Sequence, residues 1–190
     1  MRQCERLVEL DGKLPAFLEG KATPASAAER IELAGLCSLK HLNGAAARCY
    51  AEAFAAEPKL AEDLQAFHRY NAACAAALAG CGQGKDADTL DAKEKARLRG
   101  RALDWLRADL EAMGRLPDKG ADPARSAAGV GTVLRHWQVD PDLAGVRGAE
   151  ALGKLPEAER QAWKKLWDDA AGVLARAQAK TTPEKKPGAK

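Results

Sequence analysis

The sequence contains few of the residues that build β-sheets. Of its 190 residues only 5% are aromatic, and it has one Ile and six Val, against 42 Ala and 23 Leu. Val, Ile and aromatic side chains favour strands, whereas Ala and Leu favour helices. The composition therefore predicts an all-α protein and argues against a fold built on a sheet.

Long apolar runs and a strong charge bias are also missing. No apolar stretch reaches the roughly 20 residues that a membrane-spanning helix needs, and the N-terminal residues lack the apolar core of a signal peptide. Lys and Arg together number 30 against 27 Asp and Glu, without the basic stripe typical of nucleic-acid binding. We therefore expect a cytoplasmic protein that binds neither a membrane nor nucleic acid.

Motifs for catalysis and for metal binding are absent as well. The five cysteines are an odd number and form no CxxC pair, and Cys37 with His41 would supply only two metal ligands. The sequence GQGK at 82–85 lacks the first Gly and the Ser or Thr of a phosphate-binding loop and is interpreted as a flexible turn. No His lies beside a Ser or Cys in a nucleophile motif. We expect a protein that is no enzyme, with no cofactor, no metal and no small-molecule substrate.

Helix signals first appear in two N-terminal segments. Residues 1–20 carry Leu at helical spacing, but a Gly and Pro15 predict either a kinked helix or a pair of short helices. Residues 24–60 predict a hairpin of two helices joined by a tight turn. Ser26 and Glu29 have the spacing of a capping box, which predicts a helix start at 24–27.

The next segment, residues 61–114, predicts a second, degenerate hairpin. Its first helix begins at about Leu60 or Asp63 and ends at Ala79, and a flexible loop is inserted at 81–90. The helix after the loop is amphipathic, with many Arg and Lys on its polar side. On that helix Asp109 is interpreted, with its acidic neighbours, as part of a solvated, ion-paired face.

The C-terminal part predicts a helical cap followed by a tail. Gly114 should end the preceding helix, and Asp122 before Pro123 should cap the next one. Residues 122–178 then carry Trp and Leu at helical spacing, and we expect these Trp side chains to form a core. The tail at 179–190 is polar and Pro-rich and predicts disorder.

The hairpin resembles a tetratricopeptide repeat. Its small and aromatic residues follow the spacing of that repeat: Leu33, Ala34, Ala46, Tyr50, Ala53 and Pro58. In this pattern small residues let two helices approach closely, and a large ring packs against the next hairpin. The resemblance implies antiparallel helical hairpins, an α-α superhelix, capped by the Trp-rich C-terminal segment.

A second resemblance covers about residues 1–178. The matching stretches are CERLVELDGKLPAFLEG at 4–20, HRYNAACAAALAGCGQGKD at 68–86, ALDWLRADLEA at 102–112 and HWQVDPDLAGVRGAEALGKLPEAERQAWKKLW at 136–167. The last three are similar to the helical region found after the kinase domain of planctomycete serine/threonine protein kinases, and the first is similar to the segment that precedes that region. The kinase domain itself is absent, since the chain has no HRD or DFG motif. The resemblance implies a bacterial, cytosolic, signalling-related region.

In a tetratricopeptide array the first helix of each pair lines the binding groove. The candidate groove residues are therefore Ile31, Gly35, Tyr70, Asn71 and Cys74. The Asn71 amide would bind a peptide backbone or a terminal carboxylate, or it would only tie adjacent helices together. We expect a non-catalytic scaffold that binds another protein, a peptide segment or a kinase domain in cis. The alternative is a packing or dimerisation segment of a larger kinase, with no ligand of its own.

Overall fold

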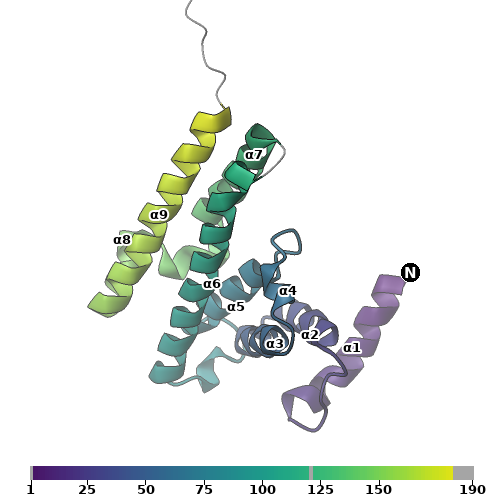
Figure 1. The fold of residues 1–190 in the computed structure, drawn as a ribbon. Helices are drawn as coiled ribbons and strands as arrows, with labels where there is room; N and C mark the ends of the chain where they lie inside the picture. The colour runs from purple at the N-terminus through teal and green to yellow at the C-terminus, as the bar shows by residue number, and fades with distance from the viewer. Residues whose placement is uncertain (1, 120–121, 182–190) are drawn as a thin grey trace, which may run out of the picture. The chain divides into compact units, whose positions relative to one another are not determined.

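The computed structural model describes residues 2–119 and 122–181 (Figure 1). Within these residues every regular element is a helix and none is a strand, so the prediction of an all-α protein is confirmed. The elements are α1 (Arg2–Leu18), α2 (Ala27–Leu39), α3 (Asn43–Ala56), α4 (Lys59–Glu62), α5 (His68–Gly80), the 3-10 helix η1 (Ala87–Thr89), α6 (Ala92–Lys119), α7 (Pro123–Val139), the 3-10 helix η2 (Pro141–Val146), α8 (Gly148–Gly153) and α9 (Glu157–Thr181).

The chain divides into two compact units, and the division falls inside α6, between Leu106 and Arg107. We call Met1–Leu106 the N-terminal unit and Arg107–Lys190 the C-terminal unit. The segment predicted over 61–114 therefore contributes residues to both units. Among the described residues, no helix combines the length and the apolar character needed to cross a lipid bilayer.

Helix α3 lies at the centre of the N-terminal unit, where it packs against α2 and α5 (Figure 1). The buried positions of these helices are mostly small side chains, which allow helix axes to approach closely. The fully buried alanines on the three helices include Ala34, Ala46, Ala53, Ala72, Ala73, Ala76 and Ala79. The larger side chains of Leu33 and Tyr50 fill the space that remains.

The three helices alternate in direction. A tight turn joins α2 to α3, so these two helices are antiparallel. Helix α5 also runs against α3, because Asn43 Nδ2 at the start of α3 donates to the carbonyl of Gln83, just after α5, at 3.0 Å. Helices α2 and α5 therefore run in the same direction on α3.

The predicted capping signals are confirmed. Helix α2 begins after Ser26, whose Oγ accepts a hydrogen bond from the backbone N of Glu29 at 3.1 Å. Helix α7 begins after Asp122, whose carboxylate accepts from the backbone N of Arg125 at 2.9 Å. Both caps satisfy amide groups that the first turn of a helix leaves without a partner.

Helix α1 is a single helix, and its Pro15 lies in the last turn without dividing it. Proline has no N–H to donate to the carbonyl of Asp11, four residues earlier. Both residues are exposed, so water reaches this side of the helix. The missing hydrogen bond therefore falls where solvent can replace it.

The helix predicted to run from about Leu60 or Asp63 to Ala79 is not continuous from either start, since α4 ends at Glu62 and α5 begins at His68. Phe67 has a φ of 55°, in the left-handed region, which a continuous right-handed helix excludes. Upstream, the Asp63 carboxylate accepts from the backbone N of Gln65 at 2.9 Å, a local hydrogen bond that competes with helix formation. The apolar periodicity alone did not show this break.

The loop at 81–90 is fastened to the turn between α2 and α3, which corrects the prediction of a flexible loop. The backbone N of Lys85 donates to the carbonyl of His41 at 2.7 Å. Gly84 has a φ of 117°, and a Cβ there would lie 3.0 Å from that same carbonyl. The glycine in GQGK thus serves a close approach of two backbone segments.

In the C-terminal unit α7 and α9 pack along each other (Figure 1). The core contains Trp137 and Trp163, each 1% exposed, which confirms the expected Trp-rich core. Trp167 is half-buried, and its Nε1 donates to the carbonyl of Val146 in η2 at 2.7 Å. Large aromatic surfaces thus hold α7, η2 and α9 together.

Two predicted helix ends differ in the structure. Helix α6 continues past Gly114 and contains Pro117. A Cβ on Gly114 would lie 3.9 Å from a Val173 methyl group of α9, so α6 is packed against α9 where the sequence predicts its end. Of the predicted tail at 179–190, residues 179–181 form the end of α9, and 182–190 lie outside the described residues.

Candidate functional site

The structure places the five predicted groove residues in different environments. Ile31 and Gly35 share a face of α2 and are half-buried, and a Cβ on Gly35 would meet nothing within 4 Å. On α5, Tyr70 and Cys74 are buried and Asn71 is exposed. Both helices pack on α3, but a partner in an open groove would reach only some of these side chains.

The Asn71 side chain joins two helices of the N-terminal unit. It hydrogen-bonds the hydroxyl of Tyr50, which lies on α3 and is 3% exposed. Burial raises the pKa of Tyr50 to about 12, and the hydrogen bond from Asn71 partly opposes this shift. Asn71 therefore ties α5 to α3, which is the second of the two roles that the sequence leaves open for it.

The buried cysteines of this unit are reduced. Cys37 and Cys49, on α2 and α3, are fully buried and hydrogen-bonded to each other. This hydrogen bond and burial raise the pKa of Cys49, so its thiol stays protonated at neutral pH. The pair acts as small apolar packing. Among the described residues no group of His, Cys, Asp and Glu is arranged to hold a metal ion.

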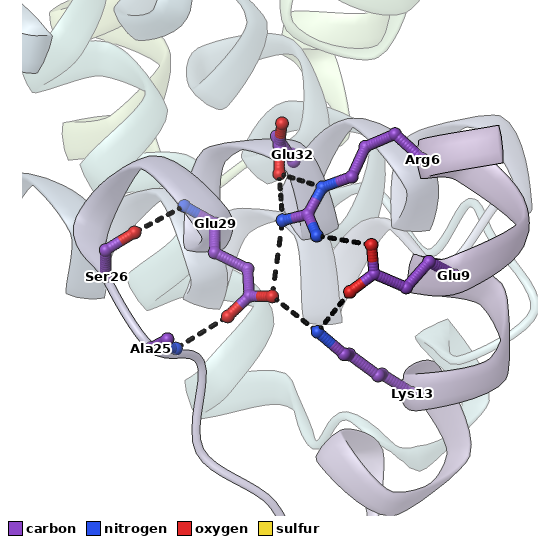
Figure 2. Close-up of polar contacts among 7 residues, drawn as sticks. All are labelled: Arg6, Glu9, Lys13, Ala25, Ser26, Glu29 and Glu32. Carbon is purple, nitrogen blue, oxygen red and sulfur yellow. Dashed lines mark hydrogen bonds and ion pairs between the residues drawn. The ribbon is translucent and has the colours of Figure 1, made fainter. Parts of the chain in front are cut away.

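Figure 2 shows a cluster of charged side chains between α1 and α2. Arg6 Nη2 lies 2.5 Å from Glu32 Oε2, and Lys13 Nζ lies 3.0 Å from Glu29 Oε1. Lys13 also pairs with Glu9 of its own helix at 2.7 Å. Each charge has its partner within the cluster, which identifies it as a contact that fastens α1 to α2.

Glu29 is the buried member of this cluster (Figure 2). Its Oε2 accepts a hydrogen bond from the backbone N of Ala25 at 2.6 Å. This bond, followed by the ion pair with Lys13, holds the pKa of Glu29 below its ordinary value. The carboxylate therefore combines a helix cap with a tertiary contact.

A groove of about 330 Å³ lies elsewhere in the N-terminal unit, where four segments meet. They are the end of α1, the start of α3, the loop before α6 and the first half of α6. Its apolar lining includes Leu18, Leu42, Leu90 and Leu98, and its charged lining is Arg48, Asp86, Glu94, Arg97 and Arg101. Binding pockets begin at about 300 Å³, so the groove has room for a few side chains of a peptide.

Asp86 builds one wall of the groove by capping α3. Its carboxylate accepts from the backbone N of Gly44 at 3.2 Å and of Ala45 at 2.8 Å. A Cβ on Gly44 would lie 3.1 Å from Asp86 Oδ2, so glycine lets the carboxylate approach. The loop at 81–90 thus completes α3 and shapes the groove at the same time.

The three groove arginines differ in their contacts. Arg97 holds Glu94 through one edge of its guanidinium, where Nε and Nη2 donate to the two carboxylate oxygens at 2.7 and 2.5 Å, and this lowers the pKa of Glu94. Arg48 lies over the Phe17 ring at 6.0 Å, and Arg101 over the Trp105 ring at 5.8 Å. In the part of the chain that the structure describes, neither of these two makes an ion pair or a hydrogen bond.

A second hollow, of about 450 Å³, lies along η2 and α8 in the C-terminal unit. Its charged groups already have partners. Arg147 donates to the carbonyls of Trp137 at 2.7 Å and Asp140 at 3.0 Å, and Lys154 pairs with Glu150 at 3.1 Å. This hollow therefore offers less to a ligand than the groove does.

Sequence reasoning missed the groove residues, because they come from four separated segments. One available signal was the i, i+4 spacing of Arg97, Arg101 and Trp105 on one helix. The interpretation of Asp109 as part of a solvated face is wrong, since this residue is only 4% exposed. It lies on the same side of α6 as the buried Leu106 and Met113, at spacings of three and four.

Comparisons with known proteins identify no related protein. No family model, no curated protein and no solved structure matches the chain. The function is therefore argued from the geometry of this chain.

Proposed function

We propose that this protein is a non-catalytic, tetratricopeptide-like helical module that binds a segment of another protein in the groove of its N-terminal unit. The groove is the observation that carries the proposal. It combines leucine side chains with two arginines, Arg48 and Arg101, that have no polar partner among the described residues. Apolar contact with a few placed polar groups is what a peptide segment needs for affinity and orientation.

The helix arrangement supports this proposal. Helices α2, α3 and α5 alternate in direction and pack through small residues, as in helical repeats that present binding surfaces. The groove walls are also held firmly, because the Asp86 carboxylate fixes the loop onto α3. A rigid wall lowers the entropy that binding must offset.

A selection from a random peptide library tests the proposal. Thr89 lies at the groove and is exposed, so Thr89→Trp should block it. Thr132, exposed on α7, provides the matched control Thr132→Trp. Circular dichroism first shows that both variants fold. Selected peptides should lose at least about tenfold in affinity for Thr89→Trp, as expected when a central contact is lost.

The control variant Thr132→Trp shows whether the loss of affinity is specific to the groove. Affinity for Thr132→Trp should stay within about twofold of the wild type, as expected for a site outside an interface. A selection that yields no binding peptide, or peptides that both variants bind as well as the wild type, would contradict the proposed function.

The second candidate function, packing or dimerisation within a larger kinase, rests on α1. Val8 is 73% exposed and its neighbour Leu7 is 37% exposed, so α1 presents apolar surface outward. Exposed apolar surface favours association. Sedimentation velocity of the wild type and Val8→Lys distinguishes the two candidates. A dimer that the substitution dissociates supports this one, and a monomer at high concentration opposes self-association.

A further inference from the structure

We infer that the groove selects an acidic segment, in which an Asp or Glu carboxylate binds between Arg48 and Arg101 beside an apolar residue. This inference rests on the proposed function and names the chemistry of its partner. It depends on three features of the groove: the state of its acidic groups, the geometry of its free arginines and the position of its leucines.

The acidic groups of the groove are already occupied. The Asp86 carboxylate accepts from two backbone amides at the start of α3, and both oxygens of the Glu94 carboxylate accept from Nε and Nη2 of Arg97. Neither carboxylate is paired with Arg48 or Arg101. The lining holds three arginines against two carboxylates, so the groove keeps a net positive charge. The N–H groups of Arg48 and Arg101 are left for a ligand, and a basic segment would be repelled.

The two free arginines are oriented by aromatic rings. The guanidinium carbon of Arg48 lies 6.0 Å from the centre of the Phe17 ring, and that of Arg101 lies 5.8 Å from the centre of the Trp105 ring. A ring engages the face of a guanidinium and leaves the N–H groups along its edges available. Those edges match a carboxylate, which accepts two parallel hydrogen bonds.

The arginines come from two different helices that line the groove, and apolar side chains line it beside them. Arg48 is on α3 and Arg101 on α6, and the lining also contains Leu90 from the loop and Leu98 from α6. A carboxylate alone would leave this apolar lining unused. A segment with an acidic residue next to an apolar one would use both.

Fluorescence anisotropy tests the inference with three labelled octapeptides, in which Leu alternates with Glu, Gln or Lys. The Glu peptide should bind the full chain in low salt, and added salt should weaken binding. Replacing Glu with Gln should weaken binding at least about tenfold, because the charge-assisted hydrogen bonds are lost. The Lys peptide should not bind.

Variants assign the effect to the two arginines. The double variant Arg48→Gln, Arg101→Gln should bind the Glu peptide at least about tenfold more weakly, as for the loss of a charged pair. The control Arg125→Gln, Arg176→Gln changes two exposed arginines of the C-terminal unit and lowers the net charge equally. It should weaken binding by no more than about twofold, the effect of long-range charge alone.

Three results would overturn the inference: no binding of the Glu peptide, equal binding of the Glu and Gln peptides, or equal weakening by both double variants. Failure of the proposed function looks different. If library peptides bind the groove and lose affinity on Thr89→Trp but carry no excess of Asp and Glu, the groove binds peptides and only the acidic preference is wrong. If the library yields no groove peptide, both fail.

Discussion

The two units of this protein differ in the size of the side chains at their helix contacts. Helices α2, α3 and α5 of the N-terminal unit meet through alanines and cysteines, whereas α7 and α9 of the C-terminal unit meet around Trp137 and Trp163. Small side chains bring backbones close together and leave no room for added atoms. Large side chains bury more apolar area each and leave a cavity when truncated. The N-terminal unit should thus be sensitive to added volume and the C-terminal unit to removed volume.

The largest expected effect is the loss of a large ring from the C-terminal unit. Trp163→Ala should lower the free energy of unfolding by about 4 kcal/mol, since Trp is 1% exposed there and truncation leaves a cavity. The half-buried Trp105 of the N-terminal unit is the comparison. Urea unfolding followed by circular dichroism measures both variants. An equal loss from Trp105→Ala would contradict the proposed difference between the units.

The next effect is the addition of one methyl group to the N-terminal unit. A Cβ on Gly80 would lie 2.9 Å from the backbone N of Arg99 and 2.9 Å from the carbonyl of Lys95, so α5 and α6 would have to separate. Gly80→Ala should cost about 2 kcal/mol, as overpacking does. Gly100→Ala is the control, because its Cβ would meet nothing within 4 Å. That change should stabilise α6 by up to about 1 kcal/mol. Thermal unfolding of the two variants should therefore shift in opposite directions.

A smaller effect is expected at the cluster between α1 and α2. Glu29→Gln should cost about 1 to 2 kcal/mol at neutral pH, because the hydrogen bond from Ala25 loses its charge. Since the folded-state pKa of Glu29 is lowered, its contribution is present above the ordinary Glu pKa and is lost as pH falls through the folded value. Urea unfolding from pH 7 to pH 3 should show a shallower decline for Glu29→Gln than for the wild type. If the free energy of unfolding of both proteins declines equally with pH, Glu29 does not contribute to the pH dependence of stability. The exposed Glu57→Gln, which lies outside this cluster, is the matched control and should decline as the wild type does.

The smallest effect concerns alkaline pH. Tyr50 has a pKa near 10 in an unfolded chain and about 12 in the fold. The unfolded chain loses this proton first, so the stability from Tyr50 is complete below pH 10 and declines as pH rises toward 12. Tyr50→Phe should be less stable than the wild type at pH 7 by less than about 1 kcal/mol, and it should lose less stability between pH 9 and 11. Denaturant unfolding at these two pH values measures the difference; an equal loss in both proteins contradicts it.

The sequence predicted what depends on neighbouring residues. The helix starts at Ser26 and Asp122 follow from a side-chain oxygen placed three residues before an amide group. The Trp-rich core of the C-terminal unit follows from apolar residues at helical spacing. These signals depend on residues close together in the sequence, so they hold in many different tertiary structures.

The sequence failed where distant residues decide the outcome. Helix α6 continues through Gly114, where it packs against Val173 of α9, a residue about 60 positions later in the sequence. This tertiary contact outweighs the low helix propensity of glycine. The loop at 81–90 is ordered because Asp86 caps α3 across 41 residues. The groove combines α1, α3, this loop and α6, and no periodic pattern links those segments. A break such as Phe67 in the left-handed region also leaves no apolar signature.

The central claim is that the N-terminal unit, through its groove, is the binding half of the molecule. A titration of ¹⁵N-labelled protein with the Leu–Glu octapeptide, followed by two-dimensional NMR of the backbone amides, tests it most directly. We predict saturable shifts at Gly44, Thr89 and Arg101, which surround the groove, and unchanged amides in α7 and α9. Shifts confined to the C-terminal unit, or none at saturating peptide, would contradict the account.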